Sequence, residues 1–140
     1  MKVLFATDGS VTAKKALAFL VTHEGVVGPD GELFVLNVQT PVSPRVTRML
    51  GSAEVKAFHL SEAGKVLDPI KKFLDRHPVK YRCDWVTGSS ADEIIKACKR
   101  RGVHLIVMGT HGYGLVGRAL MGSVAQRVIA DCDIPVLLVK

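Results

Sequence analysis

The sequence predicts an α/β fold, in which one domain over residues 1–140 holds a parallel sheet with helices on both of its faces. Short apolar runs alternate along the chain with segments whose apolar residues recur every three to four positions, and this alternation is typical of consecutive β-α-β units. Three of the apolar runs are nearly continuous, as expected of strands that are covered on both faces. A chain of 140 residues fits a single domain and is long enough to bury a sizeable core.

Five strands are expected in this sheet. The continuous runs Lys2–Thr7, Leu33–Val38 and Leu105–Met108 are predicted to form its centre. Residues 80–86 alternate apolar with polar side chains, which indicates an edge strand with one wetter face. The last run, residues 134–140, has a proline at its second position, and proline is tolerated at the start of a strand or on an edge strand.

Four helices are expected between these strands. The apolar stripe over Ala13–Val21 predicts the first helix, with Ser10 as its N-cap. The second helix carries Pro69 within its apolar stripe, which predicts a kink or a new helix start at this point. Ser90 and Ser123 are predicted to cap the third and fourth helices, because each is followed three residues later by Glu or Gln, as in a capping box.

Composition and charge argue against several classes of protein. With 48% hydrophobic and 23% charged residues, the chain is typical of a globular protein, and no apolar run approaches the roughly 20 residues of a membrane span. We therefore expect a cytoplasmic protein with no membrane partner. The three cysteines show no C-x-x-C spacing, which favours reduced thiols over disulfides or a zinc site. The net charge of +6 attracts polyanions, but the basic residues are dispersed and aromatic residues are few, which argues against nucleic acid as the partner.

A glycine-rich stretch joins the strand that ends at Met108 to the helix that starts near Ser123. In open α/β sheets the ligand crevice lies beyond the carboxyl ends of the strands, where this stretch is found. Unpaired backbone amides and the positive end of a helix meet there, and together they form an anion site. Glycine suits such a loop because a Cβ atom would block the approach of an anion, and because glycine adopts positive φ freely. The stretch is therefore predicted to bind phosphate.

Two widespread phosphate-binding motifs do not fit this sequence. The turn after the first strand reads TDGSVTA, which lacks the G-x-G-x-x-G of dinucleotide-binding proteins. The spacing of Gly117 and Gly122 resembles a P-loop, but Ser123 stands where the phosphate-binding lysine belongs. Arg118 and Arg127 lie near enough in sequence to approach a phosphate, although solvated surface charge is the ordinary role of arginine.

The spacing Gly109-x2-Gly112-x9-Gly122-Ser123 resembles the nucleotide-binding motif G-x2-G-x9-G-[S/T] of the universal stress protein family, specifically of its ATP-binding branch. The segments ATDGS after the first strand, VMGTHG at the fourth strand and PVLLVK at the end agree with this resemblance. The resemblance extends over the whole chain and is least informative between Thr40 and Val79. In that region the connection after the second strand fits a lid as well as a passive loop.

The resemblance implies a flavodoxin-like, Rossmann-like sheet of strand order 3-2-1-4-5, with the ligand between the first and fourth strands. It implies an adenosine pocket lined by Ala6, Thr7, Asp8 and Val38. It further implies a ribose and phosphate site formed by Met108, Gly109, His111, Gly112, Gly122, Ser123 and Val124. The implied ligand is ATP, with AMP and ADP as the other adenine nucleotides that the same site would take. Mg²⁺ would be bound with the nucleotide rather than at a metal site of the protein.

In the resembling family the C-terminal strand pairs with its twin across a two-fold axis, and an apolar edge strand is a template for such pairing. The resemblance therefore implies a homodimer whose interface is formed by Val136, Leu137, Leu138 and Val139.

The expected function is that of an ATP-binding, nucleotide-responsive switch in the stress response. Catalysis is not expected, because the sequence offers no P-loop lysine, no paired carboxylates and no evident nucleophile. Two alternatives stay open: a slow ATP-hydrolysing or nucleotidyl-transferring enzyme that uses Asp8 or His111, and a nucleotide-free interaction protein. A purely structural role is the other interpretation of two of these residues: Ser123 would then only cap a helix, and Asp8 would only form a turn.

Overall fold

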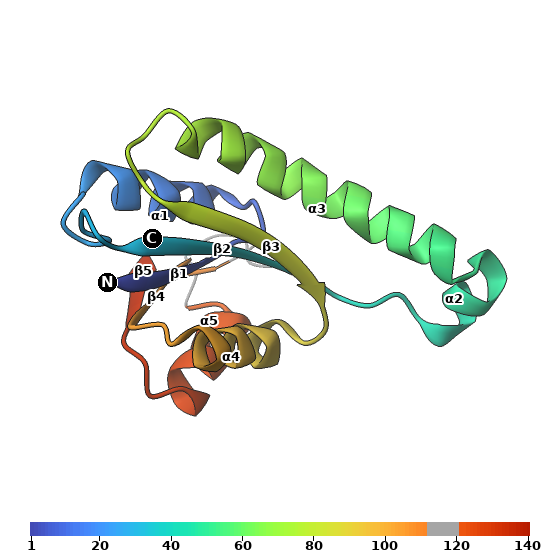
Figure 1. Ribbon diagram of the computed structural model, residues 1–140. Coiled ribbons are helices and arrows are strands. Elements are labelled where there is room, and N and C mark those ends of the chain that lie inside the picture. The colour runs from blue at the N-terminus through green and yellow to red at the C-terminus, as the bar shows by residue number, and fades with distance from the viewer. Residues whose placement is uncertain (112–120) are drawn as a thin grey trace.

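The sheet has five parallel strands in the order β3-β2-β1-β4-β5 in the computed structural model, which describes residues 1–111 and 121–140 (Figure 1). The strands are β1 (Lys2–Ala6), β2 (Glu32–Gln39), β3 (Tyr81–Thr87), β4 (Leu105–Gly109) and β5 (Val136–Val139). This order confirms the flavodoxin-like arrangement. Because β1 pairs with β2 on one side and with β4 on the other, the carboxyl ends of these three strands lie together at one edge of the sheet.

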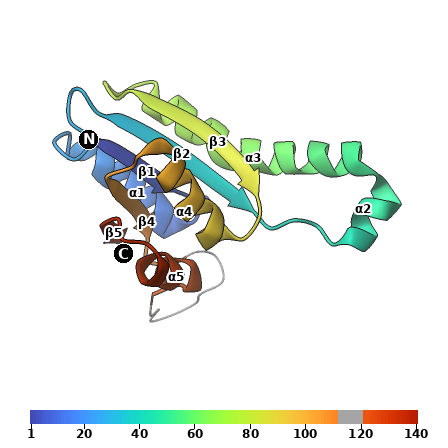
Figure 2. The same cartoon turned by 60° about the horizontal axis from the view of Figure 1, so that its bottom comes forward.

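Helices cover both faces of the sheet. They are α1 (Val11–Thr22), α2 (Pro44–Leu50), α3 (Ser52–Leu74), α4 (Ser90–Arg101) and α5 (Ser123–Asp131). Figure 1 shows α1 and α3 on one face and α4 and α5 on the other, and Figure 2 turns the second face toward the viewer. The sheet is thus the middle layer of three.

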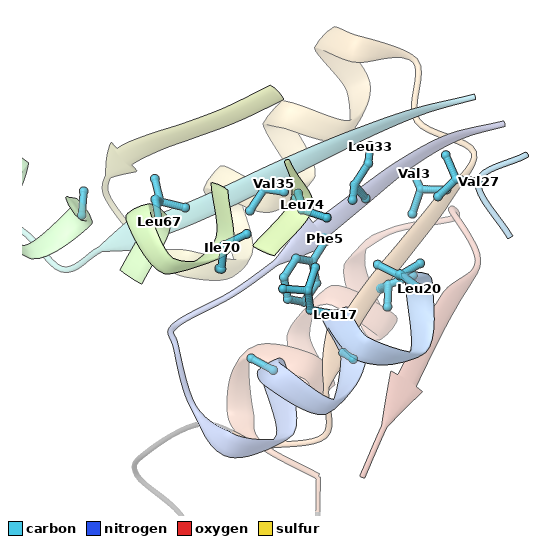
Figure 3. Close-up of a cluster of buried hydrophobic side chains, with 14 residues drawn as sticks. Val3, Phe5, Leu17, Leu20, Val27, Leu33, Val35, Leu67, Ile70 and Leu74 are labelled. Carbon is cyan, nitrogen blue, oxygen red and sulfur yellow. The ribbon is translucent and has the colours of Figure 1, made fainter. Parts of the chain in front are cut away.

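Two apolar clusters form the core, one on each face of the sheet. Val3 and Phe5 of β1 pack with α1 and α3, whereas Leu4 and Ala6 of the same strand pack with α4 and α5. This division follows from the alternation of side chains along a strand. Figure 3 shows Phe5 between Leu17 of α1 and the α3 side chains on the first face.

Helix α3 runs without interruption from Ser52 to Leu74, although it contains Pro69. Of the two alternatives expected at this proline, a kink or a new helix start, the new start is therefore wrong. Proline in a helix removes one hydrogen bond and crowds the preceding turn. The carboxyl half of α3 is held on the sheet by the buried side chains of Leu67, Ile70 and Leu74, and this packing offsets the local cost.

Neither expected capping box is formed, because each helix begins one residue earlier than the box requires. The N-cap of α4 is Ser89 rather than Ser90, and the N-cap of α5 is Gly122 rather than Ser123, with no side-chain cap bond at either helix. The amide of Gln126 donates to the Gly122 carbonyl at 3.0 Å, which makes Ser123 the first residue of α5. The cap of α1 is confirmed, since the Ser10 hydroxyl accepts a bond from the Ala13 amide at 3.4 Å.

The segment between Thr40 and Ala57 is largely helical. It contains the whole of α2, which buries none of its residues, and the start of α3. Figure 1 shows α2 and the first turns of α3 projecting beyond the sheet. Among residues 1–111 and 121–140, no helix is both long and apolar enough to cross a membrane.

Candidate functional site

A cavity of about 670 Å³ opens at the carboxyl edge of the sheet, between β1, β2 and β4 and the first turns of α4 and α5. We call it the edge cavity. Its described lining residues are Ala6, Thr7, Asp8, Ser10, Ala13, Leu36, Val38, Ser90, Ile94, Met108, Gly109, Thr110, His111, Met121, Ser123, Val124, Ala125 and Gln126.

The turn after β1 is held in a sharp bend by its own side chains. The Gly9 amide donates to the Thr7 hydroxyl at 3.1 Å, and the Ser10 amide donates to the Asp8 carboxylate at 2.9 Å. Gly9 has a φ of 79°, which favours glycine at this position. The bend ends in α1 and leaves the Asp8 side chain exposed at the rim of the edge cavity.

Gly109 at the end of β4 serves the packing of the fold. Its φ is not positive, and a Cβ atom built on it would lie 2.8 Å from the carbonyl carbon of Thr12 in α1. The Thr12 hydroxyl donates to the carbonyl of His111, which ties α1 to the chain leaving β4. The close approach of α1 to β4 therefore requires glycine at this position, which also lines the edge cavity.

The start of α5 is clamped against the exit of β4. The Gly122 amide donates to the Thr110 carbonyl at 2.6 Å, and a Cβ atom on Gly122 would lie 3.2 Å from the Cα atom of His111. The amides of Ser123, Val124 and Ala125 then occupy the first turn, where they have no partner within the helix. All three residues line the edge cavity, so the first turn of α5 and its positive end lie at the cavity wall.

The opposite wall of the edge cavity is apolar. Leu36 and Val38 of β2, Met108 of β4 and Ile94 of α4 line it, together with Ala6. Such a combination of an apolar wall and a cluster of amide donors suits a ligand with a flat apolar group and an anionic tail.

The structure brings the predicted site residues together, with two exceptions. Apart from Gly112 and Gly122, all of them line the edge cavity. Gly122 lies directly behind it as the N-cap of α5, and Gly112 lies outside the described residues.

Sequence reasoning missed the contribution of α4 to this cavity. Ser90 and Ile94 belong to a regular amphipathic helix, and nothing in their spacing distinguishes a residue over the cavity from one over the core. Arg127, in contrast, is not among the lining residues of the edge cavity. Its guanidinium pairs with Asp92 at 2.7 Å and donates to the Ser89 hydroxyl at 3.2 Å, which joins α5 to α4. In the described part of the chain, no group of three or more His, Cys, Asp or Glu residues is placed to hold a metal ion.

Comparisons with known proteins identify a family and a shared fold. The sequence model of the universal stress protein family matches residues 1–140. Universal stress protein MJ0531 of Methanocaldococcus jannaschii is 35% identical, over 99% of this chain and 81% of its own length. The solved structure of MJ0577, from the same organism, has a TM-score of 0.84 at 32% identity, and the match covers 99% of this chain and 94% of that one.

Two more distant structures share the fold and contain a nucleotide. A universal stress protein family protein from Arabidopsis thaliana with AMP bound has a TM-score of 0.68 at 20% identity, covering 100% of this chain and 91% of its own. The universal stress protein from Archaeoglobus fulgidus in complex with dAMP has a TM-score of 0.71 at 20% identity, covering 100% of this chain and 98% of its own.

Proposed function

This chain belongs to the universal stress protein family, and we propose that its edge cavity binds an adenine nucleotide, ATP above all, which makes the protein a nucleotide-responsive switch in the stress response. One observation carries this proposal: the start of α5, with its unpaired amides, and the apolar wall beside Val38 and Met108 line the same cavity. The volume of about 670 Å³ lies within the range of about 300–1,000 Å³ typical of small-molecule sites.

In this proposal the adenine base lies against the apolar wall. Val38 and Met108 would contact its faces, and the backbone of Val38, at the end of β2, would meet its hydrogen-bonding edge. Asp8 would stand beside the ribose, because its carboxylate is exposed at the rim and held by the Ser10 amide. The AMP and dAMP bound by the Arabidopsis and Archaeoglobus proteins support an adenine nucleotide as the ligand class.

The phosphates would lie at the start of α5. Ser123 and Val124 would donate their backbone amides, and the Ser123 hydroxyl would add a further donor. Gly109, Gly122 and His111 shape this end of the cavity. Mg²⁺ would be held by phosphate oxygens and water, as is common for this ion, so it needs few protein ligands.

We propose binding rather than fast phosphoryl transfer as the activity. Among the described lining residues the only ionisable side chains are Asp8 and His111. These residues therefore include no lysine or arginine and no pair of carboxylates that could stabilise the transition state of phosphoryl transfer. For such a switch the cytoplasm is the proposed location.

We also propose a homodimer through β5, which is an edge strand of the sheet. The carbonyl of Pro135 accepts a bond from the Ile106 amide in β4, and that of Val139 accepts one from the Thr110 amide directly after β4, at 2.9 Å each. Because backbone groups of successive residues in a strand point to opposite edges, those of Val136 and Leu138 point away from β4. Among the described residues no strand pairs with this edge of β5, so these groups can pair with a second copy of the same strand.

Calorimetry with nucleotide-stripped protein tests the nucleotide site. Ser123→Asp places a carboxylate at the first position of α5, where it favours the helix dipole but repels a phosphate. We expect ATP affinity to fall by at least about tenfold and adenosine affinity to change little. Ser52→Asp is the matched control, because it makes the same change at the first position of α3, away from the edge cavity.

ATP, ADP and AMP are titrated with and without Mg²⁺, which also ranks the nucleotides. Equal ATP affinity in Ser123→Asp and Ser52→Asp would show that the phosphates do not lie at the start of α5. No heat with any adenine nucleotide would contradict the proposed function as a whole.

A further inference from the structure

A second cavity, of about 780 Å³, lies on the other face of the sheet, between α1 and α3. We call it the interhelix cavity. Figure 3 shows part of its floor, where Phe5 of β1 lies between Leu17 of α1 and Ile70 of α3. The proposed nucleotide lies in the edge cavity. The two cavities share the lining residues Thr7, Asp8, Ala13 and Val38, and the other lining residues of the interhelix cavity have no part in the proposed nucleotide site.

A chain of hydrogen bonds at the end of β2 determines which nitrogen of His59 carries a proton. The Asn37 amide donates to the Thr7 carbonyl at 2.9 Å, so its oxygen is left to accept the Gln39 amide at 3.3 Å. The same Gln39 amide donates to the His59 carbonyl at 2.9 Å. The Gln39 oxygen must then be the acceptor of the bond of 2.7 Å with His59 Nδ1, which makes Nδ1 the donor.

The second ring nitrogen of His59, Nε2, has no hydrogen-bond partner among the described residues, although the residue is buried. His59 is 5% exposed and lines the interhelix cavity. Within residues 1–111 and 121–140, every fully buried polar side-chain atom has a hydrogen-bond partner, and Nε2 of His59 makes no recorded bond. Nε2 therefore keeps some accessible surface, and the interhelix cavity is a cavity that His59 lines. In the neutral ring with a proton on Nδ1, Nε2 is an acceptor.

The charges at the cavity rim balance. Lys14 and Lys65 are offset by Asp8 and Glu62, and Lys65 pairs with Glu62 at 2.7 Å. The rim thus gives no net preference for an anion or a cation. The interior combines apolar side chains from both helices with one buried acceptor.

We propose that the interhelix cavity is a second ligand site, which binds a neutral and largely apolar small molecule through one hydroxyl or N–H group donated to Nε2 of His59. The apolar floor supplies the affinity, since burying apolar surface is favourable in proportion to its area. The buried acceptor supplies the selectivity, because a ligand that fills the cavity without a donor leaves Nε2 without a hydrogen bond. The volume of about 780 Å³ accommodates a two-ring compound.

The test compares 2-naphthol with 2-methoxynaphthalene, which has similar rings but no donor. We expect 2-naphthol to bind about tenfold more tightly in calorimetry, and His59→Phe to abolish this preference. Ala18→Trp should remove the binding of both compounds, because Ala18 is an exposed α1 residue on the cavity wall. Ala130→Trp on α5 is the matched control, and it should bind both compounds as the unmodified protein does.

Methyl NMR locates the bound compound, with shifts expected at Leu17 and Ile70 and none at Leu36. The titration is repeated with the protein saturated with AMP, so that failure of this site and failure of the proposed nucleotide site are distinguishable. Absence of binding, equal affinity for the two compounds, binding that survives Ala18→Trp, or displacement of 2-naphthol by AMP would each overturn the proposal.

Discussion

Replacing Gly109 by alanine tests whether this motif glycine serves packing. A new Cβ atom would lie 2.8 Å from both the carbonyl carbon and the Cβ atom of Thr12. Carbon atoms in contact lie about 3.5–4.0 Å apart, so α1 and β4 must separate by roughly 1 Å. The neighbours are backbone and a buried side chain at the start of α1, and they have little freedom to move aside.

The free energy of unfolding should fall by about 2–3 kcal/mol. Overpacking costs about 1–3 kcal/mol, and separation of α1 from β4 also weakens the hydrogen bond from Thr12 to His111, worth about 1 kcal/mol. The lower chain entropy of unfolded alanine offsets about 0.4–1 kcal/mol of this. For a chain of 140 residues, the melting temperature should drop by roughly 10 °C.

Urea unfolding of the nucleotide-free protein measures the effect, with Gly64→Ala as the matched control. Gly64 lies inside α3, and a Cβ atom there meets only the flexible carboxylate of Asp68, at 3.3 Å. This variant should be more stable by about 0.5–1 kcal/mol, since alanine favours a helix interior. If Gly109→Ala also proved neutral or stabilising, close packing against α1 would not be the reason for glycine at this position.

Three further predictions follow from single side chains. Burial, with a smaller effect of Cys132, raises the pKa of the Cys98 thiol from 9.0 to about 12. Above pH 9.0 the unfolded chain loses this thiol proton while the folded protein keeps it, so the free energy of unfolding falls as pH rises. Urea unfolding at about pH 8 and about pH 10.5 measures this fall, which should be smaller for Cys98→Ala than for the unmodified protein. A hydrogen bond of 2.5 Å to Asp75, aided by burial, raises the pKa of Tyr81 from 10.0 to about 12, and absorbance titration of Asp75→Asn should find it closer to 10.0. Leu138→Pro removes a backbone donor from the free edge of β5, so sedimentation should find monomers; a persistent dimer would place the interface elsewhere.

Much of the fold was predictable because its signals are local. The continuous apolar runs of β1, β2 and β4 indicate strands covered on both faces, and β3, with its alternating exposure, does lie at the sheet edge. Ser10 caps α1 as expected because cap chemistry depends on a few neighbouring residues. The sequence also identified half of the described edge cavity lining, since residues at the ends of adjacent parallel strands must lie together.

The N-caps of α4 and α5 could not be predicted from the neighbouring residues alone. Ser89 and Ser90 are equally able to cap α4, and Gly122 and Ser123 are both suited to the start of α5. The choice was made by the path of the chain: the bond from the Gly122 amide to the Thr110 carbonyl holds residue 122 outside the helix. The same bond leaves the Ser123 amide as a donor at the edge cavity.

The amino-acid sequence alone specifies the succession of strands and helices and the edge at which polar groups gather, because both follow from periodicity and from the direction of parallel strands. Three contacts became known from the folded chain: Gly109 faces Thr12, α4 completes the edge cavity, and His59 on α3 meets Gln39 on β2. Each of these contacts joins residues distant in the chain. Their distances depend on how closely whole helices approach the sheet, which is set by the packing of many side chains at once.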